Sequence, residues 1–174
     1  NHRIDMHLRK SKSKGVAIDL VPIKRSAELL GLVNIILFSP EDLSIIKNSP
    51  VERRRFMDVE LCQLNRIYFS DLSNYNKVLN QRNNLLRQIS FDHSMEDMLP
   101  VWDSQLIDYG RKIIKERRKF IDKLNDIIYE IHKKLSAGKE ELRLVYDCDI
   151  EEQLFEEELL SKRAVDLRYQ STQI

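Results

Sequence analysis

Two apolar stripes at helical spacing constrain the fold of this chain more than any other feature. The first advances in steps of three and four, apart from one gap, through Met57, Leu61, Leu64, Tyr68, Leu72, Tyr75, Leu79, Leu86 and Ile89. The second advances similarly through Trp102, Leu106, Tyr109, Ile113, Phe120, Leu124, Ile127, Ile131 and Leu135. Side chains at these spacings share one side of a helix. Because only residues 90–100 form the connector, the pattern predicts an antiparallel hairpin of two long helices, and a kink in the first helix fits near residues 65–70.

Residues 1–38 follow a different pattern, which is typical of strands. Alternation in HRIDMHLRK predicts a half-buried strand, and VAIDLV predicts a second one after the polar turn KSKSKG. Pro22 is placed to open a short helix, and Gly31 is placed to close it in the left-handed conformation. The apolar run LVNIILF then predicts a buried strand.

Two Ser-Pro steps, at Ser39 and Ser49, each precede acidic residues. At a helix start the serine hydroxyl can accept a hydrogen bond from an unpaired amide, and a carboxylate complements the helix dipole. Proline fits the first helical position because it has no amide to leave unpaired. The second step adds Glu52 at the capping-box spacing. The segment therefore predicts two consecutive helices, the first very short, with a corner between them.

After Gly138 the pattern returns to that of a strand. ELRLVYD alternates apolar and polar residues, and Asp149 with Glu152 predicts a capped last helix that ends near Arg168. We therefore expect an α+β, mostly helical fold, in which an antiparallel long-helix hairpin is inserted between strands of an incomplete core. The expected divisions are residues 1–48, 49–137 and 138–174.

The charge of the chain is nearly balanced, with 29 Lys and Arg against 28 Asp and Glu. An electrostatic site must therefore be a local patch. The four glycines are too scattered for a GxxxxGK[ST] phosphate loop, the histidines and cysteines lack metal-ligand spacing, and no Ser/His/Asp set is recognisable. We therefore predict no catalytic or metal-binding residues. The sequence has no bilayer-spanning apolar run and no secretory signal, and its start without Met favours a piece of a longer protein.

Two basic clusters are candidate contacts for nucleic acid. The first is Arg53–Arg55, which spans most of a helical turn, and its Arg54 is placed to pair with Asp58. The second comprises Arg111, Lys112, Lys115, Arg117, Arg118 and Lys119. Each has a structural interpretation, as an ion-paired or solvated helix face, and a functional one, as contacts with phosphate. The hypothesis of DNA contact names Arg53, Arg55, Arg111, Lys115, Arg117 and Arg118.

Arg82 occupies the one position at which the first stripe lacks an apolar residue. Either its guanidinium extends along the hairpin to solvent, or it pairs with an acid on the second helix. The candidate acids are Asp103, Asp108 and Glu116.

From Leu29 to about Tyr146 the chain closely resembles RecF, a family of bacterial recombination mediators. Four blocks carry the resemblance in the family's order: VNIILFSPEDLSIIKNSPVERRRFMD, YNKVLNQRNNLL, VWDSQLIDYG and GKEELRLVY. RecF is similar to the SMC-type ABC ATPases, in which a helical lobe is inserted in an α/β ATP-binding lobe. The resemblance therefore implies that the incomplete core is that of an ATPase.

The resemblance also implies a function. RecF dimerises with ATP, binds duplex and gapped DNA, and with RecO and RecR helps load RecA at single-strand gaps in the cytoplasm. ATP and magnesium are the cofactors implied for a full-length member. The family's Walker A loop would lie before Asn1, and its signature, Walker B acids and a Gly-Pro-His block after Ile174, so we expect no ATPase activity from this segment alone.

The block FSPEDL takes a place comparable to the Q-loop of ABC ATPases, whose polar residue senses the γ-phosphate and metal. It has no glutamine, so the resemblance leaves Ser39 or Glu41 for a role near the nucleotide. The competing hypothesis from the residues is a helical-hairpin scaffold that mediates interactions without any link to nucleotide.

Overall fold

The computed structural model describes residues 2–8, 10, 15–37, 39–47 and 49–174. It divides into two compact units, Asn1–Arg66 and Ile67–Ile174. Most of the described residues are helical and the strands form one small sheet, which confirms the predicted α+β, mostly helical fold class. No helix in these ranges is long and apolar enough to cross a membrane.

The first unit begins with an antiparallel sheet of three strands, in the order β1 (Ile4–His7), β2 (Gly15–Ile18) and β3 (Val21–Pro22). The pairing of β1 with β2 confirms both predicted strands. The polar turn predicted between them lies mostly outside the described residues. Pro22 does not open a helix, because it is paired in β3. The predicted helix is reduced to the 3-10 turn η1 (Ser26–Leu29), and Gly31 has the predicted left-handed conformation, with φ 73°.

The prediction of a buried strand over LVNIILF is wrong for its described residues. Residues 33–37 are irregular, and Ile36 and Leu37 are 92% and 83% exposed. A strand requires hydrogen bonds to a neighbouring strand, and this segment has no such neighbour within the described part of the chain. The amide of Ile35 donates instead to Gln63 Oε1 at 2.8 Å.

The corner predicted from the two Ser-Pro steps is present. The first proline opens the 3-10 turn η2 (Pro40–Leu43), which leads into α1 (Ser44–Lys47), and the second opens α2 (Pro50–Leu64). The predicted capping box at Ser49 is wrong, because its hydroxyl makes no capping hydrogen bond. The helix start is closed by the backbone alone, through the amide of Glu52 and the carbonyl of Ser49 at 3.1 Å.

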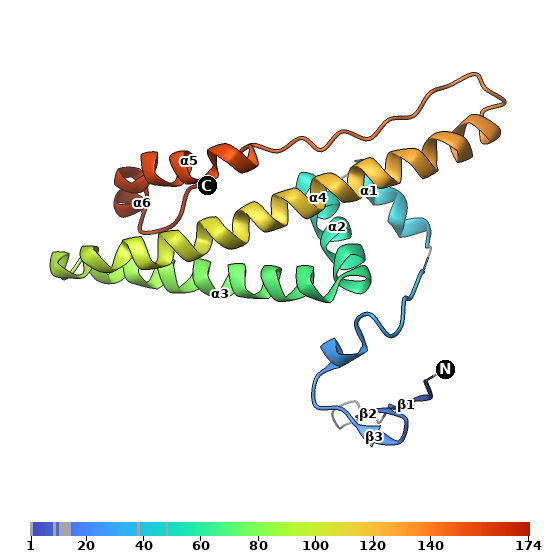
Figure 1. The fold of residues 1–174 in the computed structure, drawn as a ribbon, viewed down its shortest axis with the longest axis horizontal. Coiled ribbons are helices and arrows are strands. Elements are labelled where there is room, and N and C mark those ends of the chain that lie inside the picture. Colours follow the sequence, from blue (N-terminus) through green and yellow to red (C-terminus); the bar gives the residue numbers. More distant parts are fainter. Residues whose placement is uncertain (1, 9, 11–14, 38, 48) are drawn as a thin grey trace. The chain divides into compact units, whose positions relative to one another are not determined.

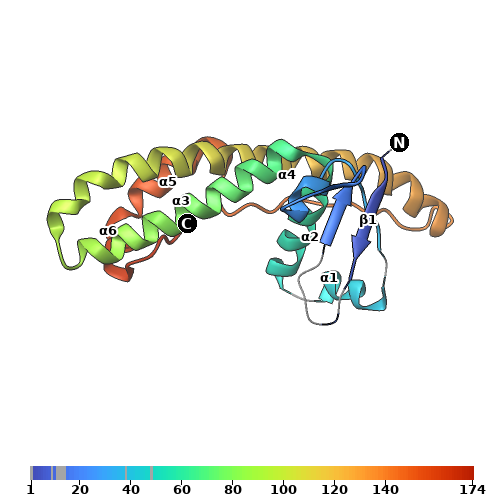
Figure 2. The same ribbon diagram turned by 90° about the horizontal axis from the view of Figure 1, so that it is seen from below.

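The second unit contains the predicted antiparallel hairpin. Its arms are α3 (Arg66–Ile89), of which Arg66 belongs to the first unit, and α4 (Leu99–Leu135), joined through the 3-10 turn η3 (His93–Met98). The two arms lie side by side in both views (Figures 1 and 2). Helical structure is interrupted between α2 and α3 at Asn65, which has an extended backbone with φ −140° and ψ 105°. The expected kink is therefore a complete helix break.

The far end of α4 departs from the predicted stripe. Ile127, Ile131 and Leu135 are each more than half exposed. Because α4 has 37 residues and α3 only 24, this end extends beyond the length that α3 can cover.

After α4 the chain returns through residues 139–149, which form no strand among the described residues. The predicted strand over ELRLVYD is therefore wrong, although the alternation is real: Leu144 and Tyr146 are half-buried between exposed neighbours. The side chain of Asn125, on α4, makes the two backbone hydrogen bonds that a neighbouring strand would otherwise make with Leu144. Its Nδ2 donates to the carbonyl of Leu144 at 2.8 Å, and the amide of Leu144 donates to its Oδ1 at 2.7 Å.

The last predicted helix is divided by the structure. It comprises the 3-10 turn η4 (Glu152–Leu154), α5 (Phe155–Ser161) and α6 (Arg163–Tyr169). The predicted capping box with Asp149 is wrong, because Glu151 is the cap residue and its side chain makes no capping hydrogen bond. After α6, Gln170 has φ 53°, and the chain turns back to end beside α5 (Figure 1).

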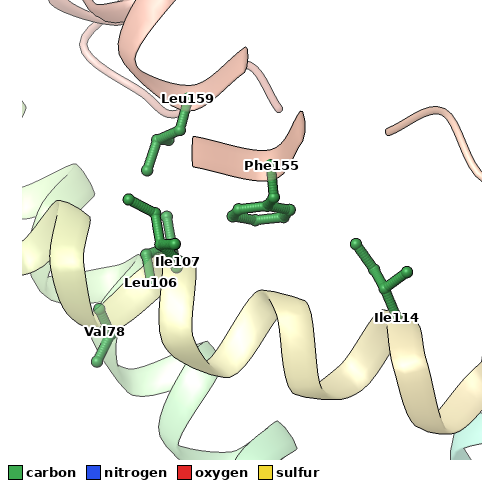
Figure 3. Packing of buried hydrophobic residues seen from close by; sticks show 6 residues of the cluster. All are labelled: Val78, Leu106, Ile107, Ile114, Phe155 and Leu159. Carbon is green, nitrogen blue, oxygen red and sulfur yellow. The ribbon is translucent and has the colours of Figure 1, made fainter. Parts of the chain in front are cut away.

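The hydrophobic core of the second unit joins α3, α4 and α5 (Figure 3). Its buried residues are Val78, Leu106, Ile107, Ile114, Phe155 and Leu159. The ring of Phe155 lies against Gly110, where an added Cβ would be only 2.5 Å from Phe155 Cζ. The missing side chain at Gly110 therefore sets how closely α5 packs on α4.

Candidate functional site

Arg82, on α3, lies at the centre of a buried charged network in the second unit. Its side chain is fully buried, its Nε donates to Asp103 Oδ1 and its Nη1 donates to Asp166 Oδ2, each at 2.7 Å. The prediction of an acid partner on the second helix is confirmed for Asp103. Asp108 and Glu116 do not take this role and pair with Lys112 and Lys119.

A second arginine completes the charge balance of the network. Nη2 of Arg163, on α6, contacts Asp103 Oδ2. Two guanidinium groups thus face two carboxylates. The carboxylates of Asp103 and Asp166 are almost completely buried. Removing water from such ions is costly, and removing one member leaves its partner buried without compensation, which typically costs about 3–5 kcal/mol.

The same network holds the last residues of the chain. Arg82 Nη1 also donates to Thr172 Oγ1 at 2.8 Å. The amide and the hydroxyl of Thr172 both donate to Asn83 Oδ1, at 2.8 and 2.7 Å. The amide of Gln173 donates to Asp166 Oδ1 at 2.8 Å, and Ile174 packs against the hydrophobic core.

Sequence reasoning found only part of this network. Arg82 was recognisable because it replaces an apolar residue in a stripe. Asp166 and Arg163 were missed, and the available signal for Asp166 was its place seven residues after the buried Leu159, on the same helical face. Nothing in the local sequence marks Thr172.

The basic cluster on α4 is extensively ion-paired in the structure. Arg111 pairs with Glu156 at 3.0 Å, and Arg118 pairs with Glu151. Lys112 and Lys119 pair within α4, as stated above. The hydrogen bond with Glu151 raises the pKa of Arg118 above its ordinary value. Exposed pairs of this kind contribute little stability, typically below about 1 kcal/mol, so these cations remain available to another anion.

The other two members of this cluster differ from each other. Arg117 is half-buried, and its Nε donates to the hydroxyl of Tyr68 at 3.1 Å. Burial raises the pKa of Tyr146, and a hydrogen bond with Arg117 acts in the opposite direction. Lys115 is exposed and makes no ion pair with any residue that the structure describes. The cluster thus combines a half-buried arginine that contacts tyrosines with an exposed lysine.

The candidate residues of the first unit lie near the corner between α1 and α2. Ser39 is half-buried and Glu41 is exposed, and a hydrogen bond with the Ser39 side chain lowers the pKa of Glu41. Arg53 Nη1 donates to the carbonyl of Ile45 at 3.3 Å, which ties the start of α2 to α1. Arg55 is exposed.

The predicted pair of Arg54 with Asp58 is not formed, and Arg54 is exposed. Sequence reasoning also missed Arg66, which donates to the backbone carbonyls of Leu30 and Glu28. The side chain of Arg66 lies within contact distance of the Cβ position at Gly31. The local order of this part of the first unit therefore depends on an arginine outside the predicted cluster.

Comparison with curated proteins gives a consistent result. The chain is 57% identical over 174 residues to "DNA replication and repair protein RecF" of Lachnoclostridium phytofermentans, covering 100% of this chain and 48% of that protein. The proteins of the same description from Agathobacter rectalis and Clostridium botulinum are 55% and 42% identical over 173 and 176 residues. These two matches cover 99% and 98% of this chain, and each covers 48% of the relative. The chain thus spans about half the length of these relatives.

Solved structures give the same result for the fold. The structure described as "recombination mediator protein RecF-ATPrS in RecFOR pathway" matches with a TM-score of 0.84 and 32% identity, over 99% of this chain and 49% of the other. The corresponding RecF-ATP structure matches with a TM-score of 0.83 and 30% identity, over 99% and 48%. A comparison with protein-family profiles gives no match.

Proposed function

Because this chain is homologous to the middle segment of RecF, we propose that it acts within a RecF-like, ATP-dependent DNA-binding protein of replication and repair. The observation that carries the proposal is the 57% identity over the whole chain, supported by a fold match at 32% identity. The finer role is to supply the helical lobe of a protein that helps load RecA at single-strand gaps. The divisions 1–48, 49–137 and 138–174 then correspond to core, hairpin and returning core.

ATP and magnesium belong to the full-length protein in this proposal. The four glycines of the sequence are too scattered for a GxxxxGK[ST] loop, and the described residues contain no group of three His, Cys, Asp or Glu that could hold a metal. Two solved structures that the chain resembles are described as RecF with ATP or ATPrS. Ser39 and Glu41, which interact at the corner of the first unit, are the residues proposed to lie near the nucleotide.

DNA contact is proposed for the exposed faces of α2 and α4. The residues are Arg53 and Arg55 on α2 and Arg111, Lys115, Arg117 and Arg118 on α4. Lys115 is the strongest of these, since it is solvated. Arg111 and Arg118 would exchange an exposed carboxylate for phosphate at small cost. Such contacts are independent of base sequence.

The other proposed associations follow from the likeness to RecF. They are an ATP-dependent homodimer, RecO and RecR as partners, gapped duplex DNA as ligand, and a cytoplasmic location. The competing function, a hairpin scaffold with no link to nucleotide, is favoured by the ion pairing on α4. The two functions differ in one measurable property, which is whether ATP changes the affinity of the full-length protein for duplex DNA.

The test measures duplex binding by the full-length protein at several salt concentrations, with and without ATP. We expect ATP to strengthen binding, and K115A/R118A to weaken it. The double variant should also flatten the salt dependence by roughly 0.9 in log–log slope for each lost phosphate contact. K134A, an exposed lysine near the end of the same helix, is the matched control and should behave as wild type. Unchanged binding in K115A/R118A would exclude α4 as a DNA surface, and a lack of response to ATP would contradict the proposed function itself.

A further inference from the structure

Two acidic side chains occupy the arginines that the proposed DNA surface on α4 would use. Arg111 Nη2 pairs with Glu156 Oε2 at 3.0 Å, and Arg118 pairs with Glu151. We propose that Glu151 and Glu156 are built-in competitors of DNA phosphate, which hold the two arginines until a polyanion displaces them. The inference concerns the regulation of the DNA surface and rests on the proposed function.

Apolar packing, and not the ion pairs, holds the two acids beside α4. Phe155 and Leu159, on α5, are buried in the core that α5 shares with α4 (Figure 3). Glu151 precedes Phe155 by four residues, and Glu156 directly follows it. The same packing therefore presents both carboxylates to α4. Because the apolar side chains fix α5, the ion pairs can open without moving the elements that carry them.

The two arginines are placed to exchange one anion for another. Their side chains are 37% and 40% exposed, and the carboxylates that they contact are 53% and 52% exposed. Arg111 Nε also donates to the carbonyl of Glu152 at 3.3 Å, which holds the side chain while Nη2 changes its partner. Exposed pairs contribute little stability, so a phosphate oxygen can replace either carboxylate at small cost.

The spacing of the basic residues favours a polyanion over a single small anion. Arg111, Lys115 and Arg118 lie at positions i, i+4 and i+7 of α4, so they share one face over about 10.5 Å. A duplex lying along this face presents about six phosphate charges over that length, against the two carboxylates. Lys115 makes no ion pair with any residue that the structure describes, so it provides the first contact. A dense row of phosphates can then displace both acids, whereas a lone anion competes with each carboxylate separately.

The experiment measures duplex binding by the full-length protein carrying E151Q/E156Q. Glutamine keeps the shape of glutamate without its charge, so both arginines lose their internal competitor. We expect this variant to bind duplex DNA about three- to tenfold more tightly than wild type, since each exposed pair corresponds to a fraction of a tenfold change. A gain in affinity also cannot result from a loss of folding.

The matched control is E130Q/E157Q. It removes two exposed carboxylates from the same unit, neither of which pairs with Arg111 or Arg118. Salt screens the charges that do not contact the surface, so at moderate salt this control should change the affinity by less than about twofold.

A further pair of variants separates the inference from the proposed function. In R111A/R118A the acids have no arginine to occupy, so adding E151Q/E156Q should change the affinity no more than E130Q/E157Q does. If R111A/R118A binds more weakly than wild type but E151Q/E156Q behaves like its control, the competition is overturned and the DNA surface stands. Wild-type affinity in R111A/R118A would exclude both arginines from DNA contact, which contradicts the proposed surface and the inference together.

Discussion

At the scale of the residue, the decisive position is Arg82. The basic residue in an apolar stripe left two alternatives, an extension to solvent or a pair with Asp103, Asp108 or Glu116, and the structure shows the pair with Asp103. The sequence could not reveal Asp166, because the distance between residues 82 and 166 is closed only by the return of the chain after α4. Local patterns report on neighbours three or four positions away, whereas this contact spans 84 residues.

The stability of the pair gives a direct test at this scale. We expect R82L and D166L each to destabilise the second unit by about 3–5 kcal/mol, because R82L leaves the buried Asp166 without an ion partner and D166L leaves Arg82 and Arg163 to share the single carboxylate of Asp103. The double variant R82L/D166L should cost clearly less than the sum, since it removes both charges. Urea unfolding followed by the fluorescence of Trp102, the one tryptophan of the chain, measures these differences.

R54A serves as the control for this cycle, because Arg54 is exposed and its loss should change stability by no more than about 0.5 kcal/mol. Strict additivity of R82L and D166L would show that the two side chains do not stabilise each other.

At the scale of the element, periodicity predicted the helices better than the strands: the first two predicted strands are present, and those over LVNIILF and ELRLVYD are not. The stripes gave the hairpin and even the region of the break at Asn65, since helical hydrogen bonds are formed within the segment itself. The apolar run LVNIILF and the alternation in ELRLVYD are both clear strand signals, but a strand needs a partner, and the sequence of a segment does not show whether one is present. The two predicted capping boxes are also wrong. The hydroxyl of Ser49 makes no capping hydrogen bond, and Glu151 is the cap residue where Asp149 was expected.

The packing of α5 on α4 leads to a prediction about Gly110. Alanine is a better helix former than glycine by about 1 kcal/mol, so propensity alone predicts that G110A stabilises α4. The structure predicts the opposite, because the new Cβ would lie 2.5 Å from the Phe155 ring. Overpacking of this kind typically costs about 1–3 kcal/mol, measured as a lower urea midpoint for the second unit.

A second substitution separates strain from other causes. In G110A/F155L the smaller side chain leaves room for the Cβ, so this variant should be more stable than G110A alone. A G110A chain that is more stable than wild type would mean that α5 does not pack as closely as the structure indicates.

At the scale of the whole molecule, the two units differ in how many buried apolar residues they contain. Nearly all the buried apolar residues found in the described ranges belong to residues 67–174, and only Met57 and Leu61 belong to the first unit. Stability follows buried apolar area. The first unit should therefore be the weaker one in the isolated 174-residue chain.

This difference predicts two unfolding transitions. In urea, far-ultraviolet circular dichroism should begin to change before the fluorescence of Trp102, which lies in the second unit. A W102F/F56W variant moves the fluorescent probe into the first unit and should report the earlier transition. Coincident curves for all three measurements would show that the units unfold together.

The double hydrogen bond between Asn125 and Leu144 fixes more than a single contact. In an extended segment, a slip of one residue turns every side chain to the opposite side. If residues 139–149 moved by one position along α4, Leu144 and Tyr146 would face solvent and Arg143 and Val145 would face the helix. Asn125 binds one backbone position only, through both its donor and its acceptor. One amide side chain thus sets the register of the whole return path, and with it the point at which α5 meets Gly110.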